Sequence, residues 1–120
     1  MIDQIYAALV DEFGDLNGWC MEACIYMWRK LKALNVDAEV IRRNMKGEGH
    51  WTIRVGETEY DPTYNWWTGG KDLYVIGKGS PQRRWRIMET SKPRPRCRDF
   101  CLTADLQGAL RRYEPHSTRG

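Results

Sequence analysis

The fold of this 120-residue chain is decided by residues 50–63, His-Trp-Thr-Ile-Arg-Val-Gly-Glu-Thr-Glu-Tyr-Asp-Pro-Thr. Polar and apolar side chains alternate over residues 50–55, which is typical of a strand with one buried face. Gly56-Glu57 supplies a two-residue turn, after which a second short strand runs to Asp61. A proline follows directly and ends that strand, because proline has no backbone N–H for the ladder. The stretch therefore predicts a β-hairpin with His50 and Asp61 at the same end.

The side chains of His50 and Asp61 are expected to meet across this hairpin. Counting outward from the turn places them within about two residues of register, and cross-strand Cβ atoms stand about 5 Å apart. The carboxylate would then accept a hydrogen bond from the ring, fix its tautomer and stabilise the imidazolium. The alternative is that Asp61 is only a turn residue before Pro62, a common position for aspartate.

A helix over residues 19–34 is predicted upstream, with Asn17 and Gly18 as its cap and turn residues. Cys20 falls in the first turn, where free backbone N–H groups and the helix dipole favour a thiolate. Cys24 lies one turn deeper on the same apolar stripe and is expected to be a buried, neutral thiol. Cys20 is therefore the candidate nucleophile, and packing is its alternative role.

A thiol, an imidazole and a carboxylate thus follow one another as Cys20, His50 and Asp61. This order suits nucleophilic catalysis, because a base can deprotonate the thiol and a third group can orient the base. We expect a cysteine enzyme that hydrolyses or transfers an amide acyl group of a protein or peptide through a Cys20 thioester. Peptidase, deamidase and transglutaminase chemistry all remain open, and no metal or cofactor is expected.

Three motifs carry a family resemblance: Gly18-Trp19-Cys20 at a helix start, His50-Trp51 at a strand start, and Tyr60-Asp61-Pro62-Thr63. Together they resemble the core of the transglutaminase-like superfamily, over residues 17–66. The resemblance implies an α+β, papain-like fold, in which a helix carrying the cysteine packs on an antiparallel sheet. It also implies a Cys-His-Asp triad made of Cys20, His50 and Asp61. In that family a residue often separates the histidine from the tryptophan, and here the two are adjacent.

The groups that would stabilise an oxyanion are less well defined. Bacterial C39-type peptidases show a similar order, but they place a glutamine about six residues before the cysteine, where this chain has Gly14. The Cys20 backbone N–H is the default donor, and Asn17 or Trp19 would supply the second. Trp51 and Trp66 are candidate substrate contacts. The aromatic run after Asp61 consists of Tyr64, Trp66 and Trp67. These side chains can line a cleft or cover the core, and we favour the core because aromatic residues dominate burial in small domains.

The remaining patterns indicate one domain over residues 1–114 and a flexible tail over 115–120, since this length supports a single core. A helix over 2–13, ending near Gly14, is expected to serve packing alone. The other expected elements are strands over 38–43, 72–76 and 82–88, a polar connection over 44–49, an irregular stretch over 91–98 and a helix over 103–113.

Charge is distributed unevenly along the chain. Residues 1–77 hold 8 basic and 12 acidic side chains, whereas residues 78–120 hold 11 basic and 4 acidic ones. The basic end suggests an alternative function, a binding module that contacts nucleic acid or an acidic protein through residues 83–98. A solvated surface is the interpretation we favour for these charges. The arginines in question are Arg83, Arg84, Arg86, Arg94, Arg96 and Arg98.

The cysteines form two C-x3-C pairs, Cys20/Cys24 and Cys97/Cys101. Such pairs can bind zinc, but the commoner zinc motif is C-x2-C, so packing is favoured for the first pair, and the second can bind metal or form a disulfide. No run of about 18 apolar residues is present to span a membrane. The N-terminus lacks the pattern of a secretion signal, so a cytoplasmic location without membrane contact is expected.

Overall fold

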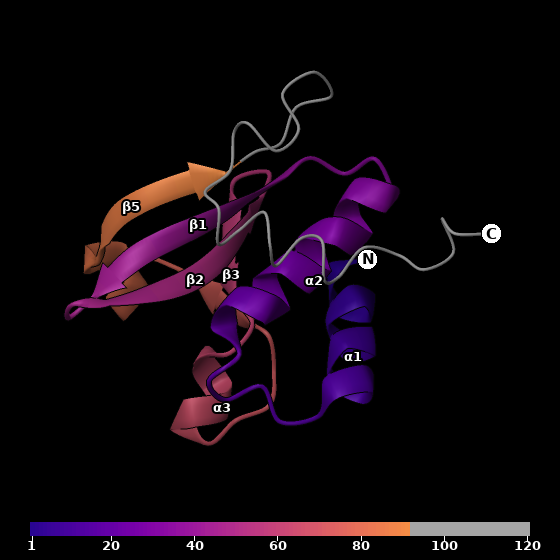
Figure 1. Cartoon of the computed structure of the whole chain (residues 1–120), viewed down its shortest axis with the longest axis horizontal. Helices are drawn as coiled ribbons and strands as arrows, with labels where there is room; N and C mark the ends of the chain where they lie inside the picture. The colour runs from indigo at the N-terminus through magenta and orange to yellow at the C-terminus, as the bar shows by residue number, and fades with distance from the viewer. Residues whose placement is uncertain (92–120) are drawn as a thin grey trace.

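The hairpin lies inside a five-stranded antiparallel sheet in the computed structural model, which describes residues 1–91 (Figure 1). The strand order is β4-β3-β2-β1-β5, and each neighbouring pair is antiparallel. The expected α+β class with an antiparallel sheet is confirmed. The strands are β1 (Ala38–Met45), β2 (Glu48–Val55), β3 (Thr58–Asp61), β4 (Tyr74–Ile76) and β5 (Arg86–Ser91).

One helix covers a face of the sheet, and a second helix packs against the first. α1 (Ile2–Phe13) and α2 (Cys20–Ala33) pack against each other, and α2 also packs against β1 and β2 (Figure 1). Both helices lie where the 3.6-residue periodicity predicts them. Their apolar stripes meet the inward side chains of the strands in one core, because alternate strand residues point to the same face. The largest fully buried side chains of this core are Leu9, Leu16, Ile25, Met27, Leu31 and Ile53.

The opposite face of the sheet carries buried polar groups. The guanidinium of Arg43 donates to both carboxylate oxygens of Glu59, at 3.0 and 2.8 Å, and to the backbone oxygen of Trp85 at 2.8 Å. The Thr52 hydroxyl donates to the same carboxylate. Because both charges are buried and their hydrogen bonds are satisfied, the pair fixes the segment around Trp85 against the sheet.

The turn between β1 and β2 is shorter than predicted. Only Lys46 and Gly47 connect the strands, with φ of 51° and 91°, so the expected polar connection over 44–49 is wrong. A two-residue turn with positive φ at both positions matches the twist of a hairpin, which lets both strands continue to the turn. The extension places Gly49 and His50 within β2.

Other boundaries also differ from expectation. Residues 81–84 form a 3₁₀ helix, η1 (Pro81–Arg84), and not the start of an edge strand, because Pro81 fits the first turn of a helix. The edge strand exists as β5, but it begins at Arg86. β4 begins at Tyr74, and a short helix that was not predicted, α3 (Tyr64–Thr68), follows β3.

Several expectations fall outside the described residues. These are the irregular stretch after Ser91, the helix over 103–113, the tail over 115–120 and the pair Cys97/Cys101. Within residues 1–91, no helix combines the length and apolar character needed to cross a bilayer.

Candidate active site

Asp61 ends β3 and is fully buried. Its Oδ1 accepts the backbone N–H groups of Thr63 (3.1 Å) and Tyr64 (3.0 Å), where the chain turns after Pro62. Its Oδ2 accepts the side-chain amide of Gln82 at 2.9 Å. A group surrounded by three donors is suited to be a carboxylate, since an ionised aspartate only accepts hydrogen bonds. Asp61 is thus a turn residue and a buried hydrogen-bond acceptor at once.

His50 lies opposite this carboxylate, as the hairpin predicts. Its Nε2 is 2.6 Å from Asp61 Oδ2, and Nε2 is the donor because Asp61 is an acceptor. The hydrogen bond fixes which ring nitrogen is engaged, so Nδ1 is the one left for Cys20. Burial alone lowers the pKa of an imidazole, but hydrogen bonds to Asp61 and Cys20, together with their charges, raise the pKa of His50 to about 9. His50 is therefore an imidazolium at neutral pH.

Cys20 is the first residue of α2 and is half-buried. Cys20 and the His50 ring line the same cleft, and the thiol contributes to the raised pKa of that ring. The chain reaches this position through Gly18, whose φ of 84° lies in the region that favours glycine. The first backbone N–H groups of a helix have no intrahelical partner and carry the positive end of the dipole, so the sulfur lies where negative charge is stabilised. The structure brings Cys20, His50 and Asp61 together in the predicted order.

Cys24 has the environment expected of a core residue. It is fully buried, and desolvation raises the pKa of its thiol well above the usual value, with a further contribution from the Asp61 charge. Burial of this kind makes a thiol inert. Cys20 and Cys24 thus lie one helical turn apart on α2, and only Cys20 is accessible from the cleft.

A cleft of about 360 Å³ opens beside Cys20 and His50. The start of α2 forms one side and the β1–β2 hairpin the other. At Gly49 a Cβ atom would lie 2.6 Å from Nε of Arg42, so a larger residue there would displace the end of that side chain. The residues lining the cleft are Asn17, Gly18, Cys20, Met45, Glu48, Gly49, His50, Thr63 and Trp67.

Two tryptophans enclose the His50 ring. Trp67 of α3 and Trp85 each meet it edge to face, with ring centroids 5.7 and 5.4 Å away. His50 is only 4% exposed as a result. Excluding water from the hydrogen bond between His50 and Asp61 strengthens it, because the local dielectric is low.

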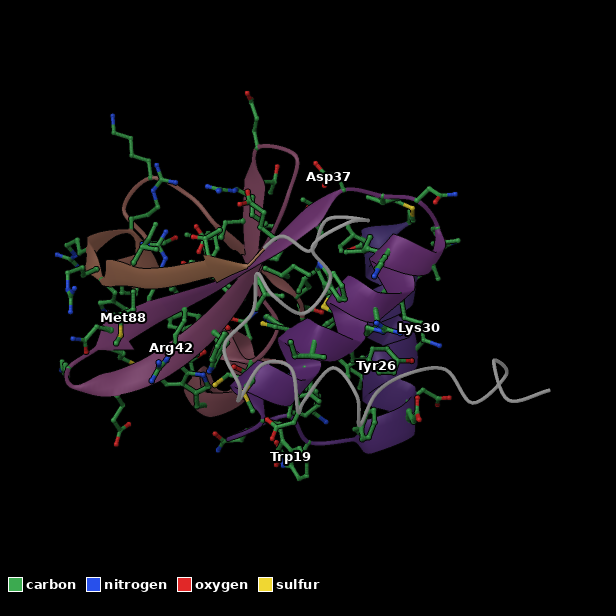
Figure 2. All side chains as sticks on the ribbon, turned by 45° about the horizontal axis from the view of Figure 1, so that its top comes forward. Trp19, Tyr26, Lys30, Asp37, Arg42 and Met88 are labelled. Carbon is green, nitrogen blue, oxygen red and sulfur yellow. The ribbon has the colours of Figure 1, made fainter. Side chains whose placement is uncertain are left out.

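The predicted accessory residues are distributed differently from expectation. Asn17 lines the cleft, but it does not cap α2, whose N-cap is Trp19 without a side-chain hydrogen bond. Trp19 projects away from the body, is 49% exposed and borders a small apolar hollow outside the cleft (Figure 2). Trp51 is buried in the core beneath the guanidinium of Arg42, and Trp66 packs on the core and donates to the Tyr6 hydroxyl at 2.7 Å. Neither Trp51 nor Trp66 lines the cleft beside Cys20.

Sequence reasoning missed Gln82 and did not assign Trp67 or Trp85 to the site. Within the aromatic run after Asp61, Trp66 packs against the core and Trp67 lines the cleft. Gln82 contacts a residue 21 positions earlier through a 3₁₀ helix, and no periodicity in the sequence indicates that contact.

Among the described residues, no group of three or more histidine, cysteine, aspartate or glutamate side chains is placed to hold a metal ion. Comparison with protein-family models, curated proteins and solved structures gave no match. The chemistry of the site is therefore inferred from its own geometry.

Proposed function

We propose that the chain is a small thiol enzyme that hydrolyses or transfers an amide acyl group through a thioester on Cys20. The supporting observation is the chain of contacts from a sulfur at a helix start, through His50, to the buried carboxylate of Asp61. The transglutaminase-like, papain-like resemblance belongs to the same proposal, and it agrees with a helix that carries Cys20 and packs on an antiparallel sheet.

In the first half-reaction the Cys20 sulfur attacks the carbonyl carbon of the amide, forming a C–S bond. The oxygen gains negative charge, which the free N–H groups at the start of α2 stabilise. His50 then donates the Nδ1 proton to the leaving nitrogen as the C–N bond breaks, while Asp61 holds Nε2. The products are an amine or ammonia and a thioester on Cys20.

In the second half-reaction a nucleophile enters the cleft and His50, now neutral, takes its proton. Water as the nucleophile gives hydrolysis, and an amine gives transfer. In both cases the C–S bond breaks and the Cys20 sulfur and the His50 imidazolium are restored. Asn17, at the edge of the cleft beside Cys20, is the candidate for a second oxyanion donor.

An activated ester tests this proposal without knowledge of the natural substrate. Incubation with p-nitrophenyl acetate is expected to release a burst of about one equivalent of nitrophenol per chain, leaving an acetyl group on Cys20 that mass spectrometry locates. Cys20→Ala should abolish the burst, and Cys24→Ala should retain it. Acetylation that is unchanged in Cys20→Ala, or equal loss in both folded variants, would contradict the proposal.

A second candidate function rests on Arg83, Arg84 and Arg86, which are all exposed. We propose as the alternative that these side chains belong to a surface that binds an acidic partner, such as nucleic acid. Binding of a fluorescent single-stranded oligonucleotide should then weaken steeply with salt, and weaken further when the three arginines are replaced by glutamine. No binding at low salt would remove this alternative.

A further inference from the structure

Gln82 is the one side chain besides His50 that donates to Oδ2 of Asp61 among the described residues. It enters from η1, which follows β4 in the chain. Its Nε2 lies 2.9 Å from Oδ2, and His50 Nε2 lies 2.6 Å from the same atom. Oδ1 is held by backbone N–H groups of the following turn. Without Gln82, Oδ2 would have His50 alone as its donor in the described part of the chain.

A second observation concerns the other end of the same amide. Gln82 is fully buried, and its Oε1 finds no hydrogen-bond partner among residues 1–91. An unpaired buried acceptor is destabilising, and a methionine of similar length would avoid that cost. The one hydrogen bond that this buried side chain makes among residues 1–91 is therefore the one to Asp61.

The local structure holds Gln82 in place. Ser80 starts η1 and exchanges hydrogen bonds with Tyr74 (2.8 Å) and with the backbone of Gly77 (2.9 Å). At the other end of η1, the backbone oxygen of Trp85 accepts from Arg43. Both ends of the segment are thus fixed to the sheet, so the Gln82 amide has little freedom to leave the carboxylate.

We propose that Gln82 is a positioning residue for the reaction proposed above: its amide shares Oδ2 of Asp61 with His50 and disperses the charge of the carboxylate. The inference rests on the proposed function, in which His50 must release its Nδ1 proton to the leaving nitrogen. A carboxylate with dispersed charge holds the imidazolium less tightly and so eases that release.

Several charged and titratable groups surround His50, and a test must distinguish their effects on its pKa. Cys20 faces the ring from α2 and Asp61 from β3. Glu48 lies at the edge of the same cleft on β2, while Arg43 and Glu59 on this face are paired with each other. A Cys20→Ala background removes the coupled thiol, so that titration of His50 reports the carboxylate and its other donor.

The experiment is an NMR titration of His50 in the Cys20→Ala background, with the second histidine of the chain as internal reference. Gln82→Met is expected to raise the pKa of His50 by about half a unit or more, because the carboxylate loses a neutral donor. Gln82→Leu, which also removes the amide donor, should raise it by a similar amount. Arg84→Met, an exposed neighbour in η1, is the matched control and should leave it unchanged.

A His50 pKa that is unchanged or lowered in both Gln82 variants would overturn the inference and leave Gln82 a packing residue. The same substitutions in chains that retain Cys20 should slow p-nitrophenyl acetate turnover about tenfold through kcat, with KM unchanged, because Gln82 does not line the cleft. If the chain with every native residue shows no burst, the proposed function fails. The titration still decides whether Gln82 controls His50, so the two failures are distinguishable.

Discussion

Replacement of Asp61 by asparagine is the perturbation with the largest expected consequence in the site. The carboxylate is fully buried and accepts from His50, from Gln82 and from two backbone N–H groups. An amide of the same shape has one oxygen and one NH₂ group. In either orientation of this amide, its NH₂ group faces two of the donors that the carboxylate accepts, and the negative charge is lost.

The magnitude follows from the pKa of His50. That pKa is about 9, against an ordinary value of 6.5. The difference corresponds to about 3 kcal/mol of net preference for the imidazolium, to which Asp61 and Cys20 contribute against the cost of burial. The unpaired buried donors add a further cost of about 1–3 kcal/mol to folding. Asp61→Asn should therefore reduce the free energy of unfolding at about pH 7 by about 3–5 kcal/mol.

Urea denaturation measures the loss of stability, and NMR titration of the His50 ring measures its pKa. In Asp61→Asn we expect that pKa to fall to the ordinary value or below it, because burial now acts without the carboxylate. Asp11→Asn, an exposed change on α1, is the matched control and should alter neither quantity. A His50 pKa that remains near 9 in Asp61→Asn would refute the assignment of Asp61 as the partner of the ring.

Three further predictions follow from the same contacts. The pKa of His50 is raised in the folded state, so its contribution to stability should be complete below about pH 6.5 and lost as the pH rises through about 9. Urea denaturation of the native chain and of His50→Gln across this pH range measures that contribution. Cys24→Ala should cost about 1 kcal/mol of stability and leave p-nitrophenyl acetate turnover intact, whereas Cys20→Ala should remove turnover with little effect on urea denaturation. Glu59→Ala should cost about 3–5 kcal/mol, because it leaves the Arg43 guanidinium buried without its carboxylate, and equal stability of the two chains would show that this ion pair does not anchor the sheet.

The hairpin and the two long helices could be predicted because their signals are local. Alternation over β2 and the two-residue turn before β3 bring His50 to Asp61 without any knowledge of the rest of the chain. The position of Cys20 at a helix start is likewise set by neighbouring residues.

The other side of the site could not be predicted, because it is built from contacts between distant segments. Arg83-Arg84-Trp85-Arg86 alternates as a strand would, yet Pro81 starts a 3₁₀ turn there and carries Gln82 to Asp61. Trp51 and Trp67 have equal hydrophobicity, and only the packing decides that one enters the core and the other lines the cleft. Lys46 with positive φ is a further case, since an ordinary lysine gives no sign of a tight turn.

The most direct test of the central claim is the rate at which iodoacetamide alkylates Cys20 at about pH 6, followed by mass spectrometry to locate the modified residue. If His50 and the start of α2 activate the Cys20 sulfur as a nucleophile, the native chain should react on the order of tenfold faster than His50→Gln, with Cys24 unmodified. Equal rates in the two chains, with both folded, would contradict the account.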